Sequence, residues 1–268
     1  MHIAEVFCQP KGKIMEDTHV MTPHYIAVFD GATPKTAFRF TLPDGTLLTP
    51  GQMAARTLAD AVRRLSPHLS AREAVDALSE SLHNALQGHR AEASGVIFSL
   101  SRNEIWLVGD CQFAFLRHTL EVHHTEKAID RLLSQWRASI VKSYLSRGLM
   151  TAEEIAASDP GRRIIQPFIS RQVRYQNRPT DPLGFGVFDG SAIPDRFIEV
   201  FPVPTDASVL ILASDGYPLL LPTLQESETA LQQLLESDPL CIGALCGTKG
   251  IQTGNCSHDD RTYLKIEF

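Results

Sequence analysis

Short apolar runs that end at glycine, asparagine or aspartate recur along the chain, and they predict a fold rich in short β-strands. The runs between residues 95 and 116 follow one another closely, as in a series of antiparallel strands. The predicted strand segments lie within 2–8, 14–29, 95–100, 105–108, 113–116, 197–201, 208–213 and 261–268.

Other stretches place their apolar residues at helical spacing, and capping boxes support several of them. In a capping box, a Ser or Thr side chain and a Glu or Gln three residues later bond each other's backbone amides. The pairs are Thr49 with Gln52, Ser70 with Glu73 and Thr151 with Glu154. The predicted helices lie within 49–65, 70–88, 125–157 and 224–237.

The strands and helices come in blocks, without the regular alternation that is typical of a parallel α/β fold. We therefore expect a single α+β domain over residues 1–268. Two stretches are rich in turn signals and prolines: 33–50, which predicts an exposed connection, and 158–195. The second stretch is either a flap over a functional site or a plain surface excursion.

Composition narrows the class of protein. The chain has 268 residues, 43% of them hydrophobic, and a formal net charge of −6, which argues against nucleic-acid binding. Lys11 and Lys13 interrupt the N-terminal region, so we expect no signal peptide, and no apolar stretch is long enough to predict a membrane span. The five cysteines are scattered, as free thiols would be. We expect a cytoplasmic monomer.

Acidic residues stand at the ends of several apolar runs, where they are costly unless something pairs with them. A divalent cation is the usual partner of several clustered carboxylates, and ligands that are all oxygen suit Mg²⁺ or Mn²⁺. The sequence therefore predicts a metal site for phosphoryl transfer. The acidic tips are Glu16-Asp17, Asp30-Gly31, Asp215-Gly216 and Asp259-Asp260.

The order of these motifs, with Val108-Gly109-Asp110 between the second and third, resembles the metal-dependent serine/threonine phosphatases of the PPM (PP2C) type. A dipeptide such as Asp-Gly is nonspecific by itself, but the ordered set covers nearly the whole chain. The resemblance implies an antiparallel β-sandwich flanked by helices, in four α-β-β-α layers. It also implies that the metal ions lie at one end of the sandwich.

The resemblance implies a role for each matching residue. Asp30 would bridge two ions of Mn²⁺ or Mg²⁺, and Gly31 would offer its backbone carbonyl. Glu16 would bind the second ion, and Asp215 and Asp259 would bind the first.

Further roles follow from the same resemblance. Asp17 would hold metal-bound water, and Asp110 matches a position that, with Asp215, can help to hold a third ion. Asp17, Asp30 and Asp215 are therefore the predicted catalytic residues. The implied reaction is hydrolysis of phosphomonoesters, with a metal-activated hydroxide attacking phosphorus in line. The implied substrate is a protein that carries phosphoserine or phosphothreonine.

Two positions depart from the family pattern. Ala32 stands where many members have a histidine that protonates the leaving group, so water, His19 or His258 would have to act instead. Gly12 stands where many members have an arginine that binds phosphate. Lys11 and Lys13 flank it and are the candidate phosphate ligands, although strand alternation would place both on the face opposite Glu16 unless Gly12 forms a turn.

These departures leave alternatives open. One is a catalytically weak relative that binds phosphoproteins or regulates a partner. Another is a phosphatase for a small metabolite. A zinc site at Cys241, Cys246, Cys256 and His258 is not favoured, because their spacing is not that of paired short cysteine motifs.

Overall fold

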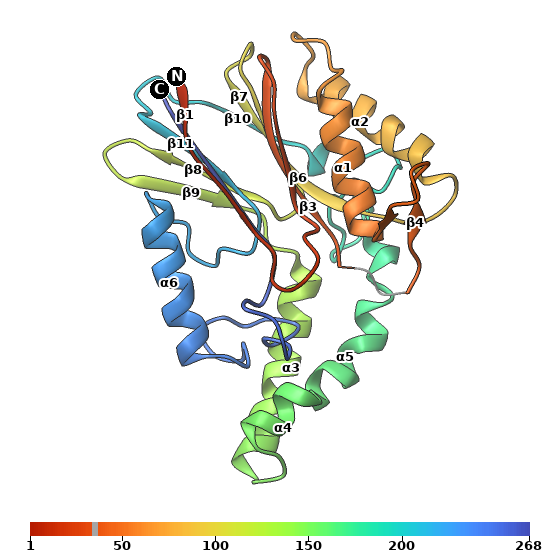
Figure 1. Cartoon of the computed structure of the whole chain (residues 1–268), viewed down its shortest axis with the longest axis vertical. Helices are drawn as coiled ribbons and strands as arrows, with labels where there is room; N and C mark the ends of the chain where they lie inside the picture. Colours follow the sequence, from red (N-terminus) through yellow and green to blue (C-terminus); the bar gives the residue numbers. More distant parts are fainter. Residues whose placement is uncertain (34–36) are drawn as a thin grey trace.

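Two antiparallel sheets of five strands each lie face to face at the centre of the molecule (Figure 1). The structure is a computed structural model that describes residues 1–33 and 37–268. The first sheet has the strand order β1-β12-β11-β8-β9, and the second has the order β10-β7-β6-β3-β2. The strands of the first sheet are β1 (His2–Gln9), β8 (Gln112–Leu116), β9 (Leu120–His124), β11 (Val209–Ala213) and β12 (Arg261–Glu267). Those of the second are β2 (Thr18–Met21), β3 (Tyr25–Gly31), β6 (Ala93–Ser99), β7 (Glu104–Val108) and β10 (Glu199–Pro202).

Alternating residues of the central strands fill the space between the sheets. Val28 and Phe98 of the second sheet meet Phe113, Leu212 and Leu264 of the first in one buried cluster. Because successive side chains of a strand point to opposite faces, the residues between them point outward, where helices or loops must cover them.

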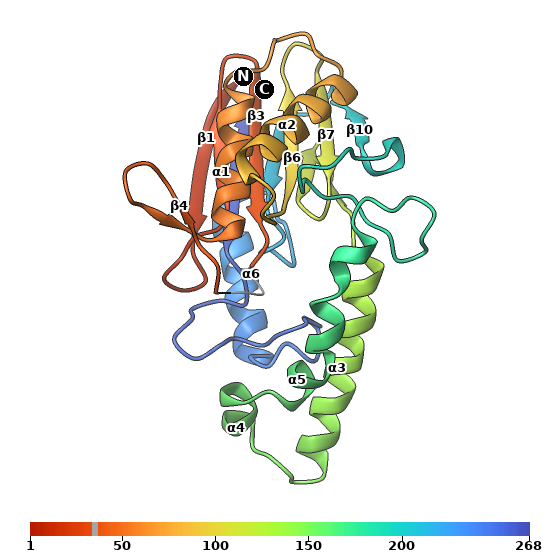
Figure 2. The same cartoon turned by 90° about the vertical axis from the view of Figure 1, so that its right-hand side faces the viewer.

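Helices α1 (Pro50–Val62) and α2 (Ala71–Leu86) cover the outer face of the second sheet, as Figures 1 and 2 show. Both helices begin at the predicted capping boxes, with Thr49 and Ser70 as the caps. Their small and branched side chains pack on Phe29 and Trp106. This confirms the predicted helix pair.

The outer face of the first sheet is buried under the segment that leads from β11 to α6 (Leu224–Ser237). Tyr217 and Leu220 of that segment pack with Ile211 of β11. Glu228 of α6 accepts hydrogen bonds from the Tyr217 hydroxyl at 2.6 Å and from Nε of Arg261 at 2.6 Å, which ties the helix to β12.

Helices α3 (Ala128–Ser146), α4 (Ala152–Ala157) and α5 (Pro160–Ile169) project beyond the end of the sandwich (Figures 1 and 2). Helices α3 and α5 pack against each other through Ile129, Leu133, Ile165 and Ile169. Gly161 permits their close approach, because a Cβ atom there would lie 2.8 Å from the carbonyl oxygen of Arg137.

Several boundaries differ from the sequence predictions. The predicted loop over 158–195 is wrong for α5, where Asp159 caps a helix that begins at Pro160. Pro167 suggested a break, yet α5 continues through it to Ile169. The predicted helix over 125–157 is interrupted between α3 and α4, where Gly148 adopts a φ of +62°.

Strand β9 was not predicted, and residues 14–17 precede β2 without forming a strand. In the predicted connection over 33–50, residues 34–36 lie outside the described residues. The part that follows includes the short strands β4 (Phe40–Thr41) and β5 (Leu47–Leu48), with the predicted turn at Asp44-Gly45 between them. None of the described helices combines the length and the apolar character that crossing a bilayer demands.

Candidate active site

The register of the strands brings the acidic tips to one end of the sandwich. Thr18 at the start of β2 pairs with Phe29 near the end of β3, so Glu16-Asp17 and Asp30-Gly31 become neighbours. Ala213 at the end of β11 pairs with Tyr263 of β12 and with Gln112 of β8. Asp215, Asp259 and Asp110 are therefore brought to the same edge, although they are far apart in the sequence.

A cleft of about 1090 Å³ opens at this edge. Its lining includes the predicted site residues Lys11, Asp30, Gly31, Asp110, Asp215 and Asp259. Glu16 and Asp17 are buried beside the cleft and are not among its lining residues. Helices α3 and α5, together with residues 245–252, form the opposite side of the cleft.

Asp30 and Asp215 form a close pair of carboxyl groups that line the cleft. Each of them affects the ionisation of the other. Burial raises the pKa of Asp30 well above its usual value, and the charges of Asp17, Asp259 and Asp110 raise it further. Although Asp215 is exposed to the cleft, desolvation by the surrounding protein raises its pKa as well, and the charge of Asp30 is the next cause. Within the part of the chain that the structure describes, no Lys or Arg forms an ion pair with either carboxylate.

Asp17 has one satisfied and one unsatisfied carboxylate oxygen. Oδ2 accepts a hydrogen bond from the Thr262 hydroxyl at 3.0 Å, whereas Oδ1 is buried and has no partner among the described residues. Burial raises the pKa of Asp17 to about 7, and the nearby charges of Asp260 and Asp215 contribute to the shift. An unpartnered buried carboxylate oxygen is expensive, so this position is suited to a cation.

Glu16 and Asp260 have structural partners. The Thr49 hydroxyl, which also caps α1, donates to Oε1 of Glu16 at 2.5 Å. Asp260 accepts the backbone amides of Lys11 and Glu16, each at 2.8 Å. Asp260 therefore holds the N-terminal segment against the start of β12, a role that the sequence did not predict.

Three lysines form ion pairs with the carboxylates of Asp259 and Asp110. Nζ of Lys11 lies 2.7 Å from Oδ1 of Asp259, and Nζ of Lys249 lies 3.0 Å from Oδ2 of the same residue. Nζ of Lys127 lies 2.8 Å from Asp110. Although burial opposes the charge of Lys11, its acidic neighbours raise its pKa above the usual value. Nothing in the sequence pointed to Lys127 or Lys249.

The chain bends at residues 11–13, after β1 has ended at Gln9. The predicted strand alternation therefore does not apply there, and Lys11 reaches the acidic cluster after all. Its Nζ is also 3.9 Å from Glu16 and 3.7 Å from Asp260. Lys13 is exposed and is not among the residues that line the cleft. Of the two candidate phosphate ligands, only Lys11 is in a position to contact a substrate in the cleft.

Of the two histidines considered as proton donors, His258 lines the cleft and His19 does not. His19 lies on β2, with Nδ1 3.3 Å from the Cys8 sulfur. Burial lowers the pKa of His258 to about 4, which leaves its ring neutral near pH 7 in the metal-free protein. Cys111 is fully buried, and burial raises the pKa of its thiol well above the usual value, as expected for a small apolar core residue.

The donors fit divalent cations in kind, because they are oxygens and several are uncompensated. In the described ranges, no group of three or more His, Cys, Asp or Glu side chains stands ready to hold an ion. Lys11 and Lys249 contact both oxygens of Asp259, and Lys127 contacts Asp110, so these two carboxylates are not free to bind a cation. Cation binding would therefore require these lysines to move away from the carboxylates.

The metal-free protein offers a test of the buried Asp17. Because its folded pKa of about 7 exceeds the usual value, the folded state keeps a proton that the unfolded state releases. The retained proton adds to the free energy of unfolding. This stabilisation is complete below about pH 4 and is lost as the pH rises to about 7, by at most roughly 1.4 kcal/mol per pH unit. We expect Asp17→Asn to gain stability relative to the wild type across this range. Urea unfolding in a chelator at pH 5 and pH 7.5 measures the difference, and an equal difference at both pH values would contradict the assignment.

Comparison with known proteins supports the fold. No protein-family model matches the chain, and no curated protein matches it in sequence. The structure resembles that of a bacterial serine phosphatase, with a TM-score of 0.52 and 13% sequence identity over 99% of this chain and 98% of that chain. It also resembles serine/threonine phosphatase Stp1 from Staphylococcus aureus, with a TM-score of 0.52 and 13% identity over 98% of this chain and 94% of that chain. These likenesses confirm the predicted α+β fold with antiparallel sheets flanked by helices.

Proposed function

We propose that this protein hydrolyses phosphomonoesters with the help of divalent cations, and that its substrates are phosphoserine or phosphothreonine residues of proteins. The observation that carries the proposal is the convergence of Asp17, Asp30 and Asp215 at one edge of the sandwich, where none of the three forms an ion pair with a Lys, Arg or His among the described residues. They lie at the end of a sandwich that the chain shares with bacterial serine/threonine phosphatases. A protein that only bound phosphoproteins would have little need for such a costly cluster.

The residues that would hold the cations are those at the edge of the cleft. Asp30 would contact two ions of Mn²⁺ or Mg²⁺, with Glu16 and the Gly31 carbonyl beside the second and Asp215 and Asp259 beside the first. Asp110 would complete a third position with Asp215. When bound, these ions would lower the pKa of water and offset charge on the phosphoryl oxygens.

Other residues would position the substrate. Lys11 would turn from Asp259 to a phosphoryl oxygen, since its flexible stem and three donors suit such an exchange. Asp17 would orient a water molecule through its free Oδ1. Ala32 lines the cleft and offers no proton, and His258 lines the same cleft but is neutral near pH 7, so the leaving group would take its proton from water.

Calorimetry and a turnover assay together test the proposal. Titration of the chelator-treated protein with Mn²⁺ should show saturable uptake, and the loaded protein should hydrolyse p-nitrophenyl phosphate and a phosphoserine peptide. Metal uptake without turnover would favour a catalytically weak regulatory module. Turnover of sugar or nucleotide phosphates in strong preference to phosphopeptides would favour a metabolite phosphatase.

Replacing Lys11 by methionine is expected to strengthen the binding of Mn²⁺ and to weaken the binding of a phosphoserine peptide. The substitution removes a positive charge from Asp259 and should strengthen Mn²⁺ binding by roughly tenfold, because the cation no longer displaces an ion pair. The same substitution should raise KM for a phosphoserine peptide, because a phosphate contact is lost. Lys13→Met is the matched control, since Lys13 is exposed and lies outside the cleft lining. If Lys11→Met binds Mn²⁺ with unchanged affinity, Lys11 does not compete with the cation for Asp259.

A further inference from the structure

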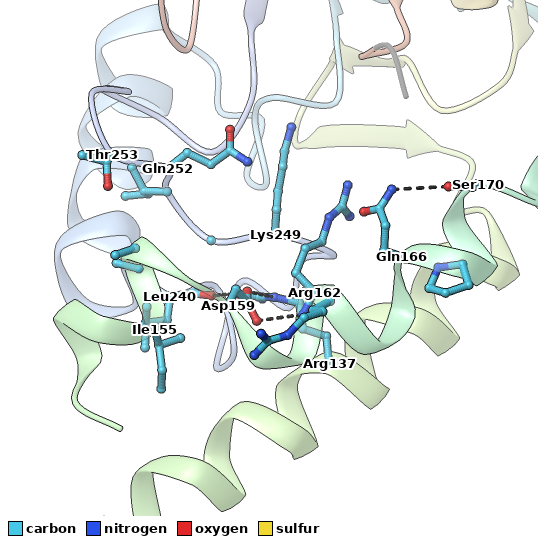
Figure 3. Close-up of a pocket in the computed structure, with 16 residues that line it drawn as sticks. Arg137, Ile155, Asp159, Arg162, Gln166, Ser170, Leu240, Lys249, Gln252 and Thr253 are labelled. Atoms are coloured by element: carbon cyan, nitrogen blue, oxygen red, sulfur yellow. Dashed lines mark hydrogen bonds and ion pairs between the residues drawn. The ribbon is translucent and has the colours of Figure 1, made fainter. Parts of the chain in front are cut away.

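A second cavity, of about 630 Å³, adjoins the acidic cleft. It lies between α5 and residues 249–253, with the floor formed by α3, as Figure 3 shows. Its charge is opposite to that of the cleft, because its charged lining residues are Arg137, Arg162, Arg163 and Lys249, with Asp159 as the single acid among them.

Arg137 forms a buried floor, and four of its five N–H donors are already used. It is fully buried, and its guanidinium donates to Oδ2 of Asp159 at 2.6 Å and to backbone carbonyls of Leu240, Cys241 and Gly247 at 2.7–3.0 Å. The other oxygen of Asp159 accepts the backbone amide of Arg162 at 2.8 Å. Both oxygens of the single acid are therefore already used.

Arg162 is left without an acidic partner among the described residues. Its guanidinium is partly buried and donates through Nη1 to the carbonyl of Thr248 at 3.0 Å. Burial and then the charge of Arg137 lower the pKa of Arg162, and the charges of Asp159 and Asp130 offset this only in part. A planar guanidinium with free donors suits the two oxygens of a carboxylate or a phosphate.

The second cavity and the acidic cleft are continuous. Arg162, Gln166, Lys249 and Gln252 line both of them. In Figure 3 the side chains of Arg162, Gln166 and Lys249 point in the same direction, away from Arg137. Lys249 marks where that direction leads, because its Nζ lies 3.0 Å from Asp259 in the cleft.

We propose that this second cavity binds an anionic group that lies a few residues from the phosphorylated residue of the substrate, with Arg162 as the main contact. The anionic group is either an Asp or Glu side chain or a second phosphate, since both present oxygens to a guanidinium in the same way. The inference rests on the proposed phosphatase function and specifies its substrate class. Arg162 thereby determines specificity without taking part in the chemistry.

A peptide panel tests the inference. One aspartate, one phosphoserine or one asparagine is moved through the positions on either side of a central phosphoserine, and kcat/KM is measured with Mn²⁺ for the wild type and for Arg162→Gln. At the best position, the wild type should prefer an anionic neighbour to asparagine by roughly tenfold. In Arg162→Gln this ratio should fall to near one. Whether aspartate or phosphoserine is preferred identifies the source of the anion.

Arg171→Gln is the control, because Arg171 is exposed just beyond the end of α5 and lines neither cavity. It should keep both the turnover and the ratio of the wild type. A wild-type ratio near one at every position, with normal turnover of p-nitrophenyl phosphate, would overturn the inference and leave the phosphatase proposal intact. The same holds if Arg162→Gln keeps the wild-type ratio.

A protein that turns over no substrate would defeat the phosphatase proposal, but binding would still test the second cavity. Fluorescence anisotropy of the labelled peptides should then show the same preference, lost in Arg162→Gln. Equal binding of the anionic and neutral peptides would overturn the inference in that case as well.

Discussion

Replacing Asp30 by asparagine is expected to abolish nearly all of the proposed phosphatase activity while making the metal-free protein more stable. Asp30 lies at the end of β3 and lines the cleft together with Asp215. Loss of a charged group that positions the cations should lower kcat/KM by at least roughly 10²–10³-fold, the order found when one preorganised electrostatic group is removed. Since asparagine carries no charge, the repulsion from Asp17, Asp110 and Asp259 is relieved at the same time.

A variant that loses activity but gains stability has lost function without misfolding. We expect Asp30→Asn to unfold at a higher urea concentration than the wild type in a chelator near pH 7, because burial and neighbouring charges oppose ionisation of Asp30 in the folded state. The wild type, in turn, should gain far more stability from Mn²⁺ than the variant does. Asp44→Asn is a suitable control, because Asp44 lies in an exposed turn in which asparagine serves equally well. Retained Mn²⁺-dependent turnover in Asp30→Asn would count heavily against the proposed function.

Replacing Gly31 by alanine is expected to destabilise the fold and to disrupt the site at once. A Cβ atom at Gly31 would lie 2.3 Å from the carbonyl oxygen of Gly51 and 2.7 Å from that of Glu16. Both obstacles are backbone atoms, which cannot move aside by changing a rotamer. The loss should be about 3 kcal/mol, at the upper end of the usual cost of overpacking.

Gly45→Ala separates this clash from the general cost of replacing glycine. Gly45 has a φ of +84°, and a Cβ atom there would meet no other atom within 4 Å, so its substitution costs only backbone strain, about 1–2 kcal/mol. Urea unfolding of both variants gives the comparison. If Gly31→Ala proves no less stable than Gly45→Ala, the tight contact between the Asp30-Gly31 tip and the start of α1 is wrong.

The sequence predicted best what is encoded locally. Thr49 and Ser70 begin helices because each bonds a backbone amide only three residues away, and this signal survives in any tertiary context. The acidic tips were visible because each adjoins an apolar run. Their convergence followed from a family resemblance in which their order mattered, rather than from any one of them.

The parts that were missed depend on contacts between distant segments. Lys127 and Lys249 look like ordinary surface lysines in the sequence, and they reach Asp110 and Asp259 only because α3 and the 238–260 segment meet at the cleft. Helix α5 was hidden by its prolines, whose effect is offset where Ile165 and Ile169 pack against α3. Arg162 could not have been singled out, because its lack of an ion pair with a carboxylate is a property of the assembled molecule.

Strand β12 lies between β1 and β11 in the first sheet, and the residue pair His2 and Glu267 brings the two ends of the described chain together. Until β12 has been synthesised, β1 has no partner strand and β11 has only β8. The first sheet therefore cannot be completed while the earlier strands are being synthesised. We therefore expect the first sheet to stay incomplete until β12 has been made. In a circular permutant that joins the adjacent ends and opens the chain at the exposed turn near Gly148, β12 would lead directly into β1, so these two strands should pair earlier, whereas β8 and β9 would join the sheet last.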